Sequence, residues 1–113
     1  MIASSKTFDE YEKLIAQTAI YPDAGRSTKL ALAYTALGLT GEAGEFSEKI
    51  KKYFRDDTLD GRLAAKELGD VLWYLTAAAN ELGFSLQDIA EINMVKLLKR
   101  KEEGKLQGSG DER

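Results

Sequence analysis

The sequence predicts a small all-α protein, and three observations support this fold class. Proline occurs only once, at Pro22, and the alternation of β-branched and polar residues that is typical of strands is sparse. Apolar residues recur at helical spacing in four segments. A chain of 113 residues is long enough for one modest core. We therefore expect a four- to five-helix bundle within a single domain, residues 1–104, followed by a flexible, glycine-rich and charged tail, residues 105–113.

The first two helices are predicted from a capping pattern and from loop signals. Thr7 and Glu10 have the spacing of a capping box, in which Thr7 caps the helix and Glu10 reaches back. This helix is expected to end near residues 21–25, where the chain reads Tyr-Pro-Asp-Ala-Gly. The second helix is predicted over about 28–54, and the loop 55–61 closes it.

The third and fourth helices are predicted over about 62–82 and from Ser85 toward Gly104. Gly83 provides a stop between them, and Ser85 with Asp88 repeats the cap-and-acid pattern. The short loops favour antiparallel neighbours for helices two, three and four. The main core stripe of the third helix is expected to comprise Leu68, Val71, Leu72, Leu75 and Leu82.

Composition excludes several classes of chemistry. The chain has no cysteine and no histidine, so it has neither a thiolate nucleophile nor the commonest general base and transition-metal ligand. A net charge of −3 argues against a stable nucleic-acid complex. No apolar run is long enough to span a membrane and no signal peptide is evident, so a cytoplasmic location is expected. Catalysis would have to use carboxylates, Lys, Tyr, Ser or a hard cation.

Four acids form two pairs at the same spacing on consecutive helices. Glu42 and Glu45 lie three residues apart, as do Glu67 and Asp70, so each pair leaves one face of its helix. These faces also carry apolar and aromatic residues, where unpaired carboxylates would repel one another. A divalent cation would neutralise them, and an all-oxygen ligand set favours Mg²⁺ first and Mn²⁺ second.

A solvated helix face is the alternative for each acid pair taken alone. Glu42 or Glu45 could pair with Lys49 for only a few tenths of a kcal/mol. The repetition on two helices favours a site, whereas Glu48 is either a third ligand or a solvated residue. Gly41 and Gly44 beside the acids would let a neighbouring helix or a phosphate group come close.

Other side chains are weaker candidates for ligand contact. Trp73 would stack on a base or fill the core, and core is the better expectation for an aromatic residue at helical spacing. Tyr74 follows Asp70 by four residues, which favours a ligand contact. Asn93 would orient a ligand or remain a partly exposed polar residue.

Two segments resemble the MazG-like all-α nucleoside triphosphate pyrophosphohydrolase superfamily. They are GEAGEFSEKIKK, which holds Glu42 and Glu45, and KELGDVLWYL, which holds Glu67 and Asp70. The upstream TAIYPDAG and LAYTALGL and the closing RKEEGKLQGSGDER are similar to small phage- or cassette-borne members. The resemblance implies Mg²⁺-dependent hydrolysis of (deoxy)nucleoside triphosphates to monophosphate and pyrophosphate, in nucleotide-pool cleansing. It also implies a homodimer or a homotetramer, as a dimer of dimers, with active sites near subunit contacts.

The resemblance also implies residue roles. The four acids would be metal ligands, and Tyr74 and Lys52 would contact the nucleotide. In a site without histidine or cysteine, an acid that is not fully committed to the metal, either Glu45 or Glu42, would orient or deprotonate the attacking water.

The composition of the tail supports a separate hypothesis. Its glycines give mobility and Asp111 and Arg113 supply charge, so it would close over bound phosphates as a lid, with Lys96 and Arg100 nearby, or it would be a disordered terminus. The proposed substrate contacts are Lys52, Trp73, Tyr74, Asn93, Lys96, Arg100, Asp111 and Arg113.

Two alternatives belong to other classes. A noncatalytic bundle that binds nucleotides or proteins would keep the fold without turnover. A di-metal oxygen-handling bundle normally uses Glu-x-x-His pairs, which a chain without histidine cannot supply.

Overall fold

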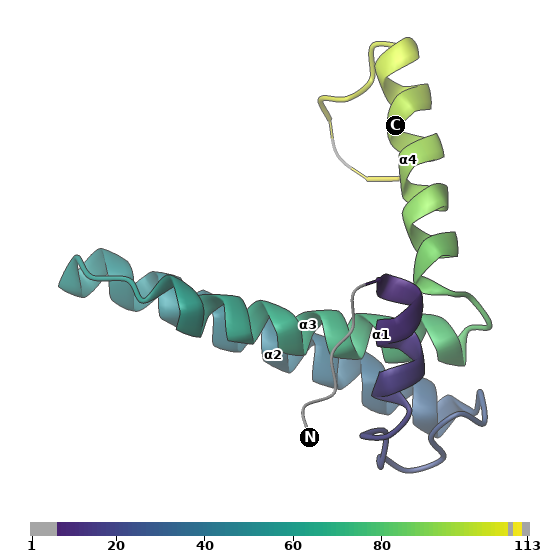
Figure 1. Cartoon of the computed structure of the whole chain (residues 1–113). Coiled ribbons are helices and arrows are strands. Elements are labelled where there is room, and N and C mark those ends of the chain that lie inside the picture. Colours follow the sequence, from purple (N-terminus) through teal and green to yellow (C-terminus); the bar gives the residue numbers. More distant parts are fainter. Residues whose placement is uncertain (1–6, 109, 112–113) are drawn as a thin grey trace.

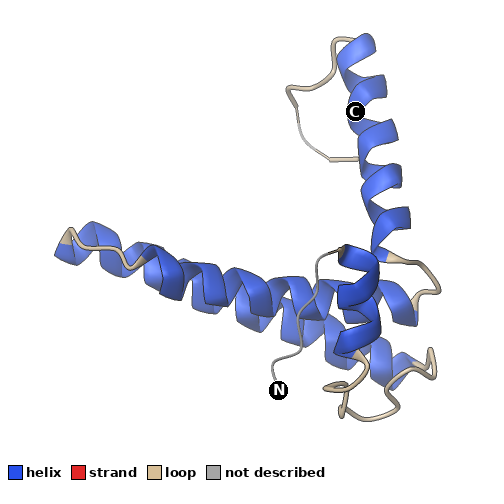
Figure 2. Ribbon diagram, viewed as in Figure 1, coloured by secondary structure: helices blue, strands red, loops and turns tan. Residues whose placement is uncertain are grey.

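The computed structural model of the protein describes residues 7–108, 110 and 111. These residues form helices and loops, and no strand occurs among them (Figures 1 and 2). The predicted all-α class is therefore confirmed, with four helices in the described part of the chain. The helices are α1 (Phe8–Ile15), α2 (Lys29–Asp56), α3 (Gly61–Glu81) and α4 (Leu86–Glu102).

The two longest helices, α2 and α3, form an antiparallel hairpin (Figure 1). Helix α2 begins after Thr28, whose side chain accepts a hydrogen bond from the backbone N–H of Ala31. It ends at Asp56, and the C-cap residue Asp57 adopts the left-handed conformation with φ 54°. Asp60 then caps α3, and the tight connection holds the two helices side by side.

Helix α4 turns away from this hairpin instead of packing along it (Figure 1). The capping box of Ser85 and Asp88 is present as predicted. Glu12 of α1 accepts hydrogen bonds from the backbone N–H of Leu86, at 2.6 Å, and from Nδ2 of Asn80, at 3.0 Å. These contacts hold the start of α4 beside α1. The expected antiparallel packing is therefore found between α2 and α3, whereas α4 does not pack along either of them.

Helix α1 ends at Ile15, several residues earlier than predicted. The hydroxyl of Thr18 donates a hydrogen bond to the carbonyl of Ile15, at 3.0 Å, and the chain then runs as loop 16–28. The buried carboxylate of Glu81 organises this loop. It accepts hydrogen bonds from the hydroxyl of Tyr21 and from the backbone N–H groups of Gly25 and Ser27, both at 2.8 Å.

Large apolar side chains remain exposed in the single chain. Leu68 and Leu82, predicted as core residues, expose about half of their surface, at 49% and 56%. The fully or nearly buried residues are mostly small and include Ala31, Thr35, Ala64, Thr76, Ala77 and Ala79.

None of the described helices is long and apolar enough to cross a membrane.

Candidate metal centre

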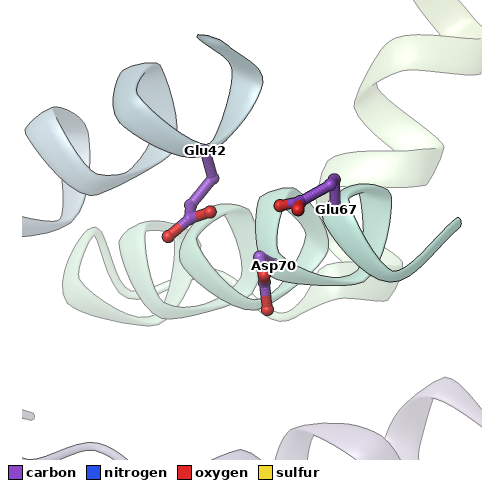
Figure 3. Close-up of side chains that lie close together, drawn as sticks. All are labelled: Glu42, Glu67 and Asp70. Carbon is purple, nitrogen blue, oxygen red and sulfur yellow. The ribbon is translucent and has the colours of Figure 1, made fainter. Parts of the chain in front are cut away.

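Three of the four predicted acids meet between α2 and α3 (Figure 3). Glu42 comes from α2, and Glu67 and Asp70 leave neighbouring turns of α3. One carboxylate oxygen of each lies within 4.8 Å of the others. Glu42 and Glu67 are half-buried and Asp70 is exposed. We call these three residues the acidic cluster.

The acidic cluster concentrates negative charge. Partial burial raises the pKa of Glu42, and the nearby charges of Asp70, Glu67 and Glu45 raise it further. None of the ion pairs found among the described residues involves a member of the cluster. A cation would therefore relieve the repulsion.

The donor set of the cluster fits a hard divalent cation. All of its ligand atoms are carboxylate oxygens, which Mg²⁺ and Mn²⁺ favour. Oxygens around an octahedral Mg²⁺ at about 2.1 Å lie roughly 3–4 Å apart. The carboxylate oxygens of the cluster lie within 4.8 Å of one another, so all three side chains could reach one cation.

Glu45 and Glu48, the other two acids of the segment GEAGEFSEKIKK, lie outside the acidic cluster. Glu45 is exposed and is not among the three grouped carboxylates, although its charge contributes to the raised pKa of Glu42. Glu48 accepts a hydrogen bond from Nζ of Lys51, at 2.9 Å, and this contact lowers the pKa of Glu48. Of the two alternatives for Glu48, the structure therefore favours the solvated residue.

Tyr74 connects the acidic cluster to an aromatic pocket. Burial raises the pKa of its phenol, followed by the influence of Tyr34, Glu42 and Asp70. The pocket has a volume of about 210 Å³ and lies between loop 16–28, α2 and α3. Its lining consists of Thr18, Ile20, Tyr21, Pro22, Tyr34, Trp73 and Tyr74.

The rings around this pocket hold one another in place. Tyr21 and Tyr34 stack at 5.6 Å between centroids, and Trp73 meets the ring of Tyr74 edge-on at 5.0 Å. The indole Nε1 of Trp73 donates a hydrogen bond to the hydroxyl of Thr18, at 2.8 Å. Trp73 is half-buried and lines the pocket, so the expectation of a core tryptophan holds only in part.

Sequence reasoning missed several residues of this site. Tyr34 lies eight residues before Glu42, on the same face of α2, and this spacing was the available signal. The pKa of Tyr11 on α1 is raised by burial and, to a smaller extent, by the charge of Asp70. Thr18 could not be predicted from a motif, because its role is to accept a hydrogen bond from Trp73 on α3.

No other described helix of this chain approaches the two glycines that lie beside the acids. A Cβ atom at Gly41 or Gly44 would meet nothing within 4 Å. Of the two occupants expected for this space, a neighbouring helix or a phosphate group, none of the described helices of this chain is the one found there. Gly38, one turn earlier, is instead the glycine that another element approaches closely.

Three of the predicted substrate contacts, Asn93, Lys96 and Arg100, lie on α4, which Figure 1 shows turned away from the hairpin. Asp111 returns to this helix, where it accepts hydrogen bonds from Lys96, at 2.8 Å, and from Arg100, at 3.1 Å. Asn93 is exposed on α4 and Lys52 is exposed on α2. The predicted residue Arg113 lies outside the described residues.

The fold and the site define an all-α protein with a carboxylate centre suited to a hard cation. The MazG nucleotide pyrophosphohydrolase domain matches residues 31–104, from the start of α2 to the end of α4, and this span includes all four acids. The chain therefore belongs to the MazG nucleotide pyrophosphohydrolase domain family. It is 42% identical over 113 residues to the Gene 37 protein of Mycobacterium phage L5, across 93% of this chain and 97% of that protein. No solved structure matches the chain significantly.

Proposed function

We propose that this protein hydrolyses (deoxy)nucleoside triphosphates to the monophosphate and pyrophosphate, in nucleotide-pool cleansing. The observation that carries the proposal is the acidic cluster, which joins acids of α2 and α3 within 4.8 Å in a MazG domain. Mg²⁺ is the proposed cofactor, with Mn²⁺ as the alternative.

The acids take different roles in this proposal. Glu42, Glu67 and Asp70 would hold the cation. When bound, the cation would neutralise charge on the triphosphate and lower the pKa of a water molecule. Glu45 lies outside the cluster but close enough to influence Glu42. We therefore assign to Glu45 the orientation of the attacking water and the acceptance of its proton.

The aromatic pocket would receive the base of the nucleotide. Its rings offer flat apolar surfaces, and Tyr74 belongs both to the pocket and to the surroundings of the acidic cluster. A nucleotide whose base occupies the pocket would direct its phosphates past Tyr74 toward the metal. This placement supports Trp73 and Tyr74 as substrate contacts, and we propose Lys52 as a phosphate contact.

A second copy of the chain would complete the site. In one chain, Asn93, Lys96 and Arg100 lie on α4. This helix is turned away from the hairpin that carries the acids (Figure 1). Exposed apolar side chains on both parts, such as Phe54 at 86% and Val95 at 69%, support an interface. We therefore propose a homodimer or homotetramer in which α4 of one copy supplies phosphate contacts to another.

Incubation of the protein with a panel of ribo- and deoxyribonucleoside triphosphates and Mg²⁺ should yield monophosphate and pyrophosphate. Separation of the products by ion-exchange chromatography and ³¹P NMR identifies them directly. Chelation of the metal should stop the reaction. Formation of diphosphate and orthophosphate would contradict the proposal. Binding of nucleotide without any turnover would support the noncatalytic alternative.

The tail is proposed to act as a lid over bound phosphates. Its Asp111 contacts Lys96 and Arg100, the two basic residues assigned to phosphate on α4. Deletion of residues 108–113 should therefore raise KM or lower kcat, whereas the thermal unfolding of the helices should change little. Unchanged steady-state kinetics in the truncated protein would exclude the lid.

A further inference from the structure

Gly38 lies within the long helix α2, where glycine is less favourable than alanine. A Cβ atom at this position would lie within 3.0 Å of three ring carbons of Tyr74, namely Cδ1, Cε1 and Cζ. Real Cβ atoms essentially never approach other atoms so closely. An alanine at position 38 would therefore force the ring of Tyr74 or the helix to move.

This close approach distinguishes Gly38 from the other helix-interior glycines of the hairpin. At Gly41 and Gly44 on α2 and at Gly69 on α3, an added Cβ would meet nothing within 4 Å. The requirement for glycine is thus confined to the place where α3 presents Tyr74 to α2. A general need for flexibility in α2 would not produce this difference.

Tyr74 occupies a junction between two parts of the site. On α2, Tyr34, Gly38 and Glu42 follow one another at four-residue spacing and share a face. The ring of Tyr74 lies over the middle member of this row. Tyr34 lines the aromatic pocket on one side, and Glu42 belongs to the acidic cluster on the other.

Contacts within α3 also restrain the same ring. Trp73 meets Tyr74 edge-on at 5.0 Å, and Trp73 is itself held by its hydrogen bond to Thr18. The ring cannot yield toward Trp73 without disturbing the pocket wall.

We infer that Gly38 is a positioning residue, whose missing side chain keeps the ring of Tyr74 at the junction of the aromatic pocket and the acidic cluster. The consequence for substrate rests on the proposed function, because a nucleotide that reaches from the pocket to the metal must pass Tyr74. Gly38 itself would act on the reaction only through Tyr74.

The variant Gly38→Ala should shift the fluorescence of Trp73, the only tryptophan of the chain, because its neighbouring ring is displaced. Its KM for the nucleotide should rise by roughly 10- to 100-fold, the scale expected for a displacement near 1 Å at a site. Binding of Mn²⁺ alone, followed by water-proton relaxation, should remain as in the wild type. A misfolded variant would lose that binding as well.

The double variant Gly38→Ala with Tyr74→Ala tests whether Gly38 acts through the ring. Once the ring is removed, the substitution at Gly38 should change neither the fluorescence nor the KM any further. As a control for helix propensity, Gly44→Ala should leave the fluorescence unchanged, since its surroundings are open. An additional loss in the double variant, relative to Tyr74→Ala alone, would overturn the inference.

Fluorescence separates this inference from the proposed function, because it requires no turnover. If the wild type hydrolyses no nucleotide but the fluorescence of the variants follows the expected pattern, the proposed function fails and the positioning of Tyr74 stands. If Gly38→Ala has the fluorescence and KM of the wild type, the positioning role is refuted, whatever the substrate is.

Discussion

An Asp70→Asn variant is expected to lose nucleoside triphosphate hydrolysis by at least about 100-fold, since even loss of an outer-shell partner costs 10- to 100-fold at metal sites. Asparagine keeps the shape of the side chain but removes one of the three charges that would attract the cation. The same change relieves repulsion among carboxylates that lie within 4.8 Å of one another. Without metal, the variant should therefore be at least as stable as the wild type.

Thermal unfolding with and without Mg²⁺ separates loss of metal from loss of fold. A ligand that binds only the folded state raises the melting temperature, so Mg²⁺ should stabilise the wild type and fail to stabilise Asp70→Asn. Glu48→Gln is the matched control, because Glu48 is exposed on the same hairpin and pairs with Lys51 instead. Full turnover, or an undiminished response to Mg²⁺, in Asp70→Asn would contradict the metal assignment.

Glu45→Gln separates the proposed base from the ligands. Because Glu45 lies outside the acidic cluster, this variant should retain stabilisation by Mg²⁺ while kcat falls. Loss of both properties would instead make Glu45 a ligand, as the family resemblance implies.

Helix beginnings could be predicted from the sequence because capping is local. Thr7 and Ser85 each accept a hydrogen bond from the backbone N–H three residues later, as their patterns indicate. The end of α1 could not be predicted in this way. The loop that follows α1 is held by Glu81, which lies more than 50 residues further along the chain. Short-range patterns contain no information about such a partner.

In the candidate site, too, the local features could be predicted from the sequence and the contacts between helices could not. The spacing of Glu67 and Asp70 placed both on one face of a helix, and the structure agrees. The choice of Glu42 over Glu45 as their partner depends on how α2 is rotated against α3. That rotation is set by packing along the whole α2–α3 interface, which involves residues far apart in the sequence. A sequence pattern on one helix could therefore predict the pairs but not their assembly.

Replacement of Glu81 by glutamine is expected to destabilise the fold by roughly 2–4 kcal/mol, since hydrogen bonds to a charged group contribute about 1.5–3 kcal/mol each. Glu81 is only 5% exposed and accepts from Tyr21, Gly25 and Ser27. The amide of glutamine would turn a donor toward these donors. Because each kcal/mol shifts the melting temperature by about 4–8 °C in a small domain, calorimetry would resolve the loss easily. Glu102→Gln, at the exposed end of α4, should show no comparable change.

The contribution of Glu81 should also depend on pH with a defined sign. Burial alone would raise its pKa, but the hydrogen bonds from Tyr21, Gly25 and Ser27 outweigh burial and hold the pKa below its ordinary value of 4.5. A carboxyl group with a lowered pKa in the folded state stabilises the protein above its unfolded pKa, and this contribution is lost as the pH falls through the folded pKa.

Urea denaturation of the wild type and Glu81→Gln between pH 7 and pH 3 would test this sign. The difference between their unfolding free energies should be constant near neutral pH and should shrink below pH 4.5, the ordinary pKa of the group. A difference that stays constant down to pH 3 would show that the charge of Glu81 does not hold the loop. Since this loop carries Tyr21 into the aromatic pocket, loss of the Glu81 contacts should disturb the pocket before the α2–α3 hairpin unfolds.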